Sequence, residues 1–303
     1  MIKKCPNCNS TDVKVKYSNL TDKNYFIDGK FSLMLCNKCK LEFLDPLLTE
    51  QQVERYYPKE DYYSFYDYNK MALAYHKLSA YYYSRKNKLF NMLFYIFSPI
   101  FYTYYIEKGK SVLEIGCGNG MKLAIYQKYG MKTYGLEPYL PKVGSREKKL
   151  GIEKKSVKDA GYKENSFDYI ILKEVLEHVP DQKLVLSKAY SWLKPGGNLI
   201  ITVPNTKGLW KDMFKENWYG YDVPRHFYNY NPKNLAENVK KFGFKIKKIR
   251  AYDMPYMFDG SLKFKYPKNN IIFSNFTKII AVPLSLAVTN LKKGSLIEMH
   301  CTK

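Results

Sequence analysis

The chain of 303 residues is long enough for one large domain and a second, smaller one. Its hydrophobic content of 46% is ordinary for a soluble protein. The formal net charge of +22 raises the question of nucleic-acid binding, but only five of the 50 basic residues are Arg and the Lys residues are scattered. Because Arg is the preferred residue for bidentate phosphate contacts, this composition disfavours a groove that follows a phosphate backbone.

Residues 1–46 carry two C-x-x-C pairs, Cys5 with Cys8 and Cys36 with Cys39. The first ten residues lack the apolar core of a signal peptide, which predicts a cytoplasmic location. In a reducing compartment such pairs indicate a metal rather than disulfides, although a redox pair is the alternative. Two tight turns that each present two thiolates supply the four sulfurs of a tetrahedral structural Zn²⁺ site. We therefore expect a small zinc-ribbon-like β module.

Residues 47–107 are expected to form a helical, tyrosine-rich connector that caps the following domain. The segment TEQQVERYYP begins like a capped helix and stops at Pro58. A longer helical stretch is expected over about 69–106, interrupted at Pro99. Its charge-free part, 89–106, falls just short of a membrane-spanning length, and its polar residues and Pro argue against a transmembrane helix.

From residue 108 onward, apolar strand-like runs alternate with helical segments, which indicates an α/β domain over 108–303. One helix boundary is well marked, because Asn231 can cap the helix, Pro232 takes its first position and Gly243 ends it. The expected strands are 110–115, 131–136, 152–157, 168–172, 197–203, 245–251 and 295–302.

Residues 252–294 form an insertion before the last strand. Its segment 271–288 is apolar with a single Lys and is expected to break at Pro283, giving a helical hairpin that covers the core. The alternative is an interfacial helix in peripheral contact with a membrane, because aromatic and basic residues surround the apolar segment.

The stretch VLEIGCGNG at 112–120 is an apolar strand followed by a glycine-rich turn. Such a turn lets a ligand approach the backbone, and the start of the next helix offers free N–H groups. A second acid, Glu137, ends the next strand, where a carboxylate can accept both hydroxyls of a ribose. The spacing G-x-G-x-G, without the Lys-Ser/Thr ending of a phosphate loop, favours a nucleoside over a pyrophosphate.

Four motifs in order, VLEIGCGNG, Glu137, SFDYIILKEVLEHVPD (166–181) and LKPGGNLIITVPN (193–205), resemble those of class I S-adenosylmethionine-dependent methyltransferases. The resemblance covers residues 108–250 and implies an enzyme with a seven-stranded Rossmann-like sheet that uses S-adenosyl-L-methionine.

The resemblance also assigns roles within the cofactor site. The backbone from Gly116 to Gly118 would face the methionine part, Glu114 its amino group, Glu137 the ribose and Tyr139 the adenine. The segment SVKDA (156–160) lies where related enzymes contact the adenine edge. The expected cofactor-binding residues are Glu114, Gly116, Cys117, Gly118, Gly120, Glu137, Pro138, Tyr139, Ser156, Val157, Asp159 and Lys173.

The motif E-x-x-E-H predicts the catalytic residues. If a helix begins near Lys173, then Glu174, Glu177 and His178 project from one face, and His226 can fold over them from a later loop. This set resembles that of ubiquinone O-methyltransferases and small-RNA 2′-O-methyltransferases, in which it holds a divalent ion, Mg²⁺ or another, that binds the acceptor hydroxyls. The alternative has no metal, with His178 as a hydrogen-bonding group or general base.

The zinc-ribbon-like module, the tyrosine-rich connector and the PRHFYNYNP loop together resemble bacterial methyltransferases associated with surface glycans. The resemblance implies O-methylation of a sugar, a glycan or another small hydroxylated acceptor, which includes lipid-linked acceptors at the inner face of the membrane. Three alternatives stay open: methylation of a carbon atom of a sugar, since sugar C-methyltransferases also carry N-terminal zinc modules, methylation of a quinone precursor, and methylation of rRNA or tRNA. The low Arg content and the absence of an N-P-P-Y-type motif count against RNA.

Overall fold

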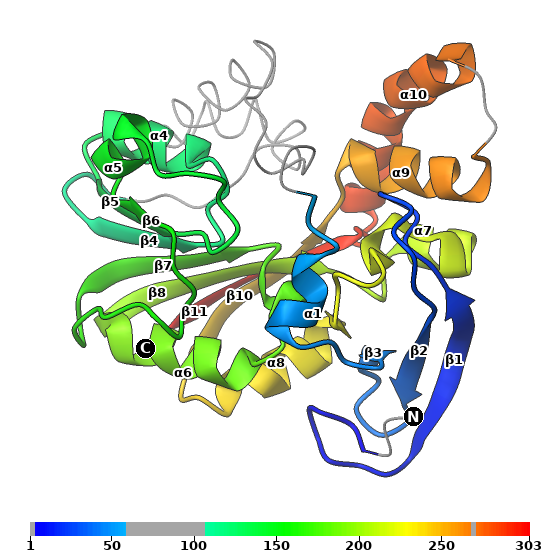
Figure 1. The fold of residues 1–303 in the computed structure, drawn as a ribbon, viewed down its shortest axis with the longest axis horizontal. Helices are drawn as coiled ribbons and strands as arrows, with labels where there is room; N and C mark the ends of the chain where they lie inside the picture. The colour runs from blue at the N-terminus through cyan, green and yellow to red at the C-terminus, as the bar shows by residue number, and fades with distance from the viewer. Residues whose placement is uncertain (1–3, 59–106, 268–270) are drawn as a thin grey trace.

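The computed structural model describes residues 4–58, 107–267 and 271–303, and two β-sheets organise this part of the chain (Figure 1). The helical stretch expected over 69–106, including its charge-free part, lies outside the described residues. The larger sheet has seven strands in the order β10-β11-β8-β7-β4-β5-β6, and only β11 runs antiparallel to its neighbours. The expected seven-stranded Rossmann-like α/β sheet is therefore confirmed.

The strands of this sheet lie where apolar runs predict them. Their bounds are β4 Ser111–Ile115, β5 Lys132–Leu136, β6 Ile152–Glu153, β7 Phe167–Lys173, β8 Leu193–Pro204, β10 Lys245–Tyr252 and β11 Leu296–Thr302. Strand β4 is buried at all five positions, as a central parallel strand covered on both faces must be. The strand predicted for 152–157 is much shorter. This strand lies at the sheet edge. It ends before Lys154 and Lys155, whose side chains are exposed and would add no buried apolar surface to the sheet.

Helices connect the strands and cover the sheet. They are α4 Met121–Lys128, α5 Ser145–Lys149, α6 Gln182–Trp192, α7 Leu209–Phe214 and α8 Pro232–Lys240, with short 3-10 turns η2 Leu176–His178, η3 Lys215–Asn217 and η4 Tyr219–Tyr221. Helix α8 begins as predicted, because the Asn231 side chain accepts hydrogen bonds from the backbone N–H groups of Lys233 and Asn234. Gly243 follows its end with a φ of +90°.

The smaller sheet contains three strands near the N-terminus and one from much later in the chain. Strands β1 Val13–Leu20, β2 Phe31–Cys36 and β3 Glu42–Asp45 are followed in the sheet by β9 Tyr228–Asn229. The strand β9 pairs with β3 through Phe43 and Tyr228, so the N-terminal module and the larger domain share one sheet (Figure 1). In the chain, helix α1 Glu50–Glu54 follows β3. It is capped at its start, as predicted, because the Thr49 side chain accepts a hydrogen bond from the Gln52 N–H.

The insertion forms two packed helices, α9 Pro255–Lys265 and α10 Ile271–Asn290. The prediction that the apolar segment breaks at Pro283 was wrong, since α10 continues through this residue. Pro283 and Ile279 are both exposed, so the Ile279 carbonyl that loses its helical partner lies on the solvent side. Within the described ranges, no helix has the length and apolar character needed to cross a bilayer.

Candidate active site

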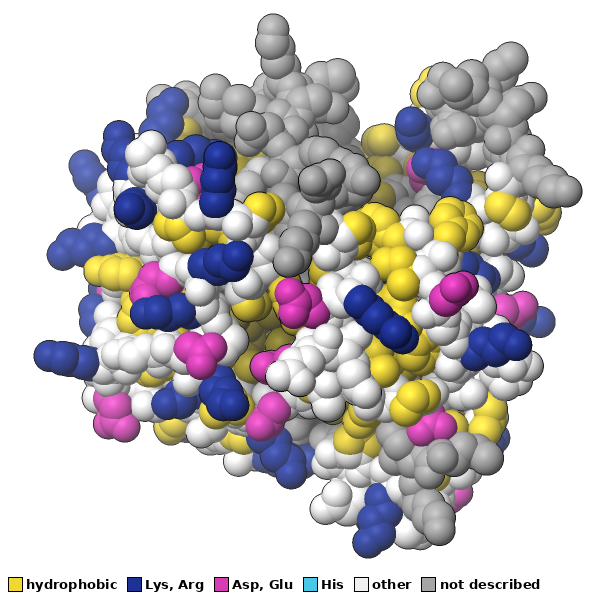
Figure 2. Space-filling model, viewed as in Figure 1, with side chains coloured by type: hydrophobic (Ala, Val, Ile, Leu, Met, Phe, Trp, Pro, Cys, Tyr) yellow, Lys and Arg dark blue, Asp and Glu magenta, His cyan; other side chains and the backbone are white. Residues whose placement is uncertain are grey.

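A cavity of about 470 Å³ lies beside the glycine-rich turn, and we call it the glycine-loop cavity. Figure 2 shows a hollow on this face, with hydrophobic side chains at its base and acidic side chains around its rim. Seven of the predicted cofactor-binding residues line the cavity: Gly116, Glu137, Pro138, Tyr139, Ser156, Val157 and Asp159. The other five do not line it: Glu114, Cys117, Gly118, Gly120 and Lys173.

The glycine-rich turn after β4 adopts backbone conformations that side chains disfavour. Gly116 has a φ of +68°, and a Cβ there would collide with Val175. Gly120 has a φ of +74°, and a Cβ there would collide with Ile152. These two glycines are therefore required by sterics, and Gly116 also opens the cavity wall to a ligand.

The Glu137 carboxylate is fixed at the end of β5. Its Oε2 accepts a hydrogen bond from the Gly118 N–H at 2.9 Å, and its Oε1 accepts one from the Tyr139 N–H at 3.2 Å. Burial raises the pKa of Glu137 above its usual range. A carboxylate has about four lone-pair sites, so both oxygens can still accept hydrogen bonds from a ligand in the cavity.

Glu114 lies behind the cavity wall with a cationic partner. It is 3% exposed, and its Oε1 is 3.6 Å from the Lys122 Nζ. Burial raises the pKa of Glu114. Burial and the nearby charge of Lys173 together lower the pKa of Lys122 to about 7.

The predicted helix from Lys173 was wrong. Glu174 has a left-handed φ of +53°, and its N–H donates to the Thr202 carbonyl at 2.7 Å, which extends the contact between β7 and β8. Only a 3-10 turn follows, so Glu174 does not share a helical face with Glu177 and His178. The Glu174 carboxylate instead accepts a hydrogen bond from the Tyr256 hydroxyl of α9 at 2.8 Å.

Glu177, His178 and His226 come together as predicted, and we call them the carboxylate–histidine cluster. One ligand atom from each residue lies within 4.8 Å of the other two. Glu177 is fully buried, and neither of its carboxylate oxygens has a hydrogen-bond partner in the described part of the chain. Burial raises the pKa of Glu177 well above its usual range, so this orphaned side chain keeps its proton unless a cation or a ligand completes the cluster.

Hydrogen bonds at Nδ1 indicate which nitrogen of each imidazole carries the lone pair. The Nδ1 of His226 lies 2.8 Å from the Gly220 carbonyl, and because a carbonyl only accepts, this Nδ1 carries the hydrogen and Nε2 presents a lone pair. The Nδ1 of His178 lies 3.2 Å from the Arg225 carbonyl and 3.0 Å from the Tyr57 hydroxyl, so its Nε2 presents a lone pair when Nδ1 donates to the carbonyl. Burial lowers the pKa of both imidazoles, which keeps them neutral near pH 7.

Sequence reasoning missed Tyr57, which connects the cavity to the cluster. Its ring stacks on Tyr139 with centroids 4.6 Å apart, and its hydroxyl lies 3.0 Å from the His178 Nδ1. The acids Glu50 and Glu54 of α1 also line the cavity. Nothing local distinguishes Tyr57 among the 30 tyrosines of the chain, because its contacts lie far along the sequence.

Sequence reasoning also missed Arg225, which is fully buried beside the cluster. Its guanidinium donates to Asp222 at 2.6 and 2.9 Å and to Asp22 at 2.8 and 3.0 Å. Its Nη1 also donates to the Tyr56 carbonyl at 3.1 Å. Asp22 belongs to the loop between β1 and β2, so this ion pair connects the N-terminal module to the loop that carries His226.

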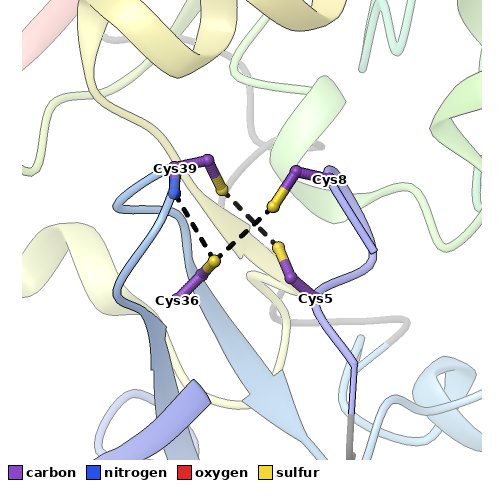
Figure 3. Close-up of side chains that lie close together, drawn as sticks. All are labelled: Cys5, Cys8, Cys36 and Cys39. Atoms are coloured by element: carbon purple, nitrogen blue, oxygen red, sulfur yellow. Dashed lines mark hydrogen bonds between the residues drawn. The ribbon is translucent and has the colours of Figure 1, made fainter. Parts of the chain in front are cut away.

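The four predicted zinc ligands, Cys5, Cys8, Cys36 and Cys39, face one point (Figure 3). The sulfurs of Cys5 and Cys39 are 3.6 Å apart, and so are those of Cys8 and Cys36. Four thiolates around a tetrahedral Zn²⁺ with bonds of about 2.3 Å are separated by about 3.8 Å, so the donor set fits the ion. The Cys39 N–H also points to the Cys36 sulfur at 3.5 Å.

A glycine turn follows β4, and an acid follows the neighbouring parallel strand β5. This arrangement is typical of the nucleoside-binding sites of Rossmann-like folds. A methyltransferase-domain family profile matches residues 86–249, more than half of the chain. The chain therefore belongs to the family of methyltransferase domains.

Two curated relatives show the range of the family. The chain is 30% identical to phosphoethanolamine N-methyltransferase 2 of Caenorhabditis elegans over 46% of this chain and 33% of that protein. It is 34% identical to the ubiquinone biosynthesis O-methyltransferase of Xanthomonas campestris pv. campestris, over 32% of this chain and 44% of that one. The chain thus spans less than half of each relative.

Among solved structures, the chain is similar to a 1,6-didemethyltoxoflavin-N1-methyltransferase from Burkholderia thailandensis. The TM-score is 0.48 at 14% identity, over 92% of this chain and 98% of that one. A methyltransferase from Thermotoga maritima gives a TM-score of 0.45 at 16% identity, over 74% of this chain and 99% of that one.

Proposed function

We propose that the chain methylates a hydroxyl group of a small acceptor, with S-adenosylmethionine bound in the glycine-loop cavity. The observation that carries this proposal is the position of His178, which lines the cavity and belongs to the carboxylate–histidine cluster. A donor site and a polar acceptor site therefore share one wall. Methyl transfer from a sulfonium is an in-line displacement, so an acceptor oxygen held at this wall gains much of its rate from positioning.

On the donor side, the Gly116 backbone faces the methionine part of the cofactor. Glu137 accepts hydrogen bonds from the ribose hydroxyls, Tyr139 covers the adenine, and the segment from Ser156 to Asp159 contacts the adenine edge. Of the remaining predicted residues, Cys117, Gly118 and Gly120 belong to the turn, and Glu114 and Lys173 lie in β4 and β7 outside the cavity lining.

On the acceptor side, Glu177, His178 and His226 hold a divalent ion in this proposal. The unpartnered Glu177 oxygens and the two Nε2 lone pairs support it. Because Glu174 is turned toward Tyr256, the set has two nitrogens and one carboxylate, which suits Mn²⁺, Fe²⁺ or Zn²⁺ better than Mg²⁺. Such an ion, when bound, lowers the pKa of a coordinated hydroxyl.

Without an ion, His178 is the general base. Its Nε2 would accept the proton of the acceptor hydroxyl as the oxygen–methyl bond forms and the sulfur–methyl bond breaks. S-adenosylhomocysteine then leaves as the neutral thioether. The Arg225 carbonyl orients the imidazole for this task by binding its Nδ1–H.

We further propose that the four-cysteine cluster binds one structural Zn²⁺, in a module of residues 1–46 followed by a connector (47–107) and a catalytic domain (108–303). The sulfur spacings support the zinc site. The module shares the β3–β9 pairing with the catalytic domain, which gives it a supporting role for the acceptor loop.

A sugar or a glycan, which includes lipid-linked sugars, is the acceptor class that we propose. A quinone precursor is the second candidate, favoured by the 34% identity to a ubiquinone biosynthesis O-methyltransferase. Isotope-labelled S-adenosylmethionine should transfer its label to sugar nucleotides or lipid-linked sugars rather than to catechols or to bulk tRNA. Label found only in catechols would favour the quinone alternative, and label found only in tRNA or in amines would contradict hydroxyl methylation of a small acceptor.

The cofactor site can be tested separately from the acceptor. Glu137→Ala should weaken the binding of S-adenosylhomocysteine by about 10–100-fold, because hydrogen bonds to a charged group contribute about 1.5–3 kcal/mol. Isothermal titration calorimetry measures this, and Glu237→Ala on the exposed side of α8 is the matched control. Equal affinity of Glu137→Ala and the wild type would remove Glu137 from the site.

A further inference from the structure

The inward side of helix α10 combines polar and apolar contacts. The Thr277 hydroxyl donates to the buried Asp259 carboxylate at 2.6 Å. The backbone N–H of Asp253 donates to the Thr289 hydroxyl at 2.8 Å, and Ser285 is fully buried. Ala281 and Val288 are buried beside them, so only part of the apolar surface of α10 faces the protein.

The outward side of α10 carries an apolar ridge. Ile279 is 72% exposed and Leu291, just past the end of the helix, is 65% exposed, with Pro283 and Ala287 exposed between them. These four residues follow one another at spacings of four, so they form one row about 18 Å long at the helical rise of 1.5 Å per residue. Val282, 41% exposed, widens the row.

The charges around this ridge have a single sign. Lys278, Lys292 and Lys293 are exposed at its two ends. The only acids of the insertion are Asp253 and Asp259, which are 0% and 8% exposed. Asp253 accepts a hydrogen bond from the Trp210 indole, and Asp259 accepts one from the Thr277 hydroxyl. The surface of the insertion thus presents apolar side chains and lysines without an exposed carboxylate in its described part.

We propose that the lysine-rimmed ridge, formed by Ile279, Val282, Pro283, Ala287, Leu291, Lys278, Lys292 and Lys293, docks on an anionic lipid surface. Helix α10 lies beside α9 at the edge of the molecule, where a flat surface can approach its exposed side (Figure 1). Lysines at its ends match the negative charge of lipid phosphates, and apolar side chains between them can enter the acyl boundary. This contact does not depend on which acceptor the enzyme methylates.

Co-sedimentation of the full chain with vesicles tests the proposal. The protein should pellet with vesicles of phosphatidylcholine and phosphatidylglycerol, and much less with phosphatidylcholine alone. The double variant Ile279→Asp with Leu291→Asp should lower the vesicle affinity about tenfold, and Lys292→Glu with Lys293→Glu should do so on anionic vesicles. Raising the salt concentration should weaken binding by the wild type.

The matched control is Val15→Asp, which places the same charge at another exposed apolar position, on β1. This variant should pellet as the wild type does, and unchanged circular dichroism should show that every variant is folded. Failure of the wild type to pellet with either vesicle, or equal pelleting by the ridge variant and the wild type, would overturn the proposal. The proposal would also be overturned if the wild type formed a dimer and the ridge variant were monomeric, because the ridge would then be a contact between copies of the chain.

Discussion

Cys39→Ser is expected to remove the structural Zn²⁺ and to lower the rate of methyl transfer by at least about 100-fold. A structural zinc site contributes on the order of 10 kcal/mol to the folding of a small module, so the loss of one of four ligands disorders the turns that hold it. The effect on activity follows from what these turns contact.

The second zinc-binding turn rests on the start of α8. The Cys39 carbonyl accepts a hydrogen bond from the Asn234 side chain at 3.3 Å, and the Lys40 carbonyl accepts one from the Asn231 side chain at 3.4 Å. These two asparagines form the capping box of α8, which follows directly on the loop that carries His226. Loss of the turn therefore removes a support of the carboxylate–histidine cluster.

A second connection runs through Arg225. Asp22 of the module forms a buried bidentate ion pair with this guanidinium, and the Arg225 carbonyl sets the orientation of His178. Without Asp22 the guanidinium keeps Asp222 as a partner but loses two hydrogen bonds to a charged group, so we expect the loop to rearrange when Asp22 moves away. Both connections reach the acceptor side of the site.

The donor side should respond much less. Gly116 and Glu137 directly follow strands β4 and β5 of the larger sheet, so the affinity of Cys39→Ser for S-adenosylhomocysteine should stay within about tenfold of the wild type. Elemental analysis, calorimetry and a methyl-transfer assay measure the three quantities. Cys301→Ser, which changes a buried cysteine outside the cluster, should keep its zinc and most of its activity. Full activity in a zinc-free Cys39→Ser protein would show that the module does not support the acceptor site.

The parts of the fold that depend on local patterns were predictable. Strand β4 has a mainly apolar sequence, Ser-Val-Leu-Glu-Ile, because both of its faces are covered, and α8 carries its cap in the sequence Asn231-Pro232. The four cysteines were predictable as a cluster because metal ligands must be paired on tight turns. Each of these signals lies within a few residues.

The features that the sequence did not predict depend on contacts between distant residues or on which side of a helix faces solvent. Glu174 could not be placed because its left-handed backbone depends on the hydrogen bond to Thr202 in the neighbouring strand. Arg225 pairs with Asp22 across 203 positions of the chain, which no periodicity reveals. Pro283 is tolerated because it faces solvent, and the apolar pattern alone could not show which side of α10 is buried.

Glu177→Gln is expected to abolish metal binding at the carboxylate–histidine cluster and to reduce methyl transfer by at least about 100-fold. Glutamine keeps the shape of the side chain but replaces one ligand oxygen by an amide nitrogen and removes the negative charge. Binding of S-adenosylhomocysteine should not change, because Glu177 does not line the glycine-loop cavity.

The sharper readout of Glu177→Gln is thermal unfolding, which does not depend on the acceptor. An ion at 100 times its dissociation constant stabilises the native state by about 2.7 kcal/mol, so Mn²⁺ or Zn²⁺ should raise the unfolding midpoint of the wild type. Mn²⁺ should not shift the unfolding midpoint of Glu177→Gln, because Mn²⁺ binds thiolates poorly and so does not act on the four cysteines. Zn²⁺ should shift this midpoint only by its effect on the four cysteines. Glu237→Gln, an exposed glutamate on α8, should respond as the wild type does. If Mn²⁺ shifts neither midpoint, and Zn²⁺ shifts both equally, while Glu177→Gln loses activity, the cluster works without a metal and His178 is its base. If Glu177→Gln methylates at the wild-type rate, the cluster has no part in the reaction.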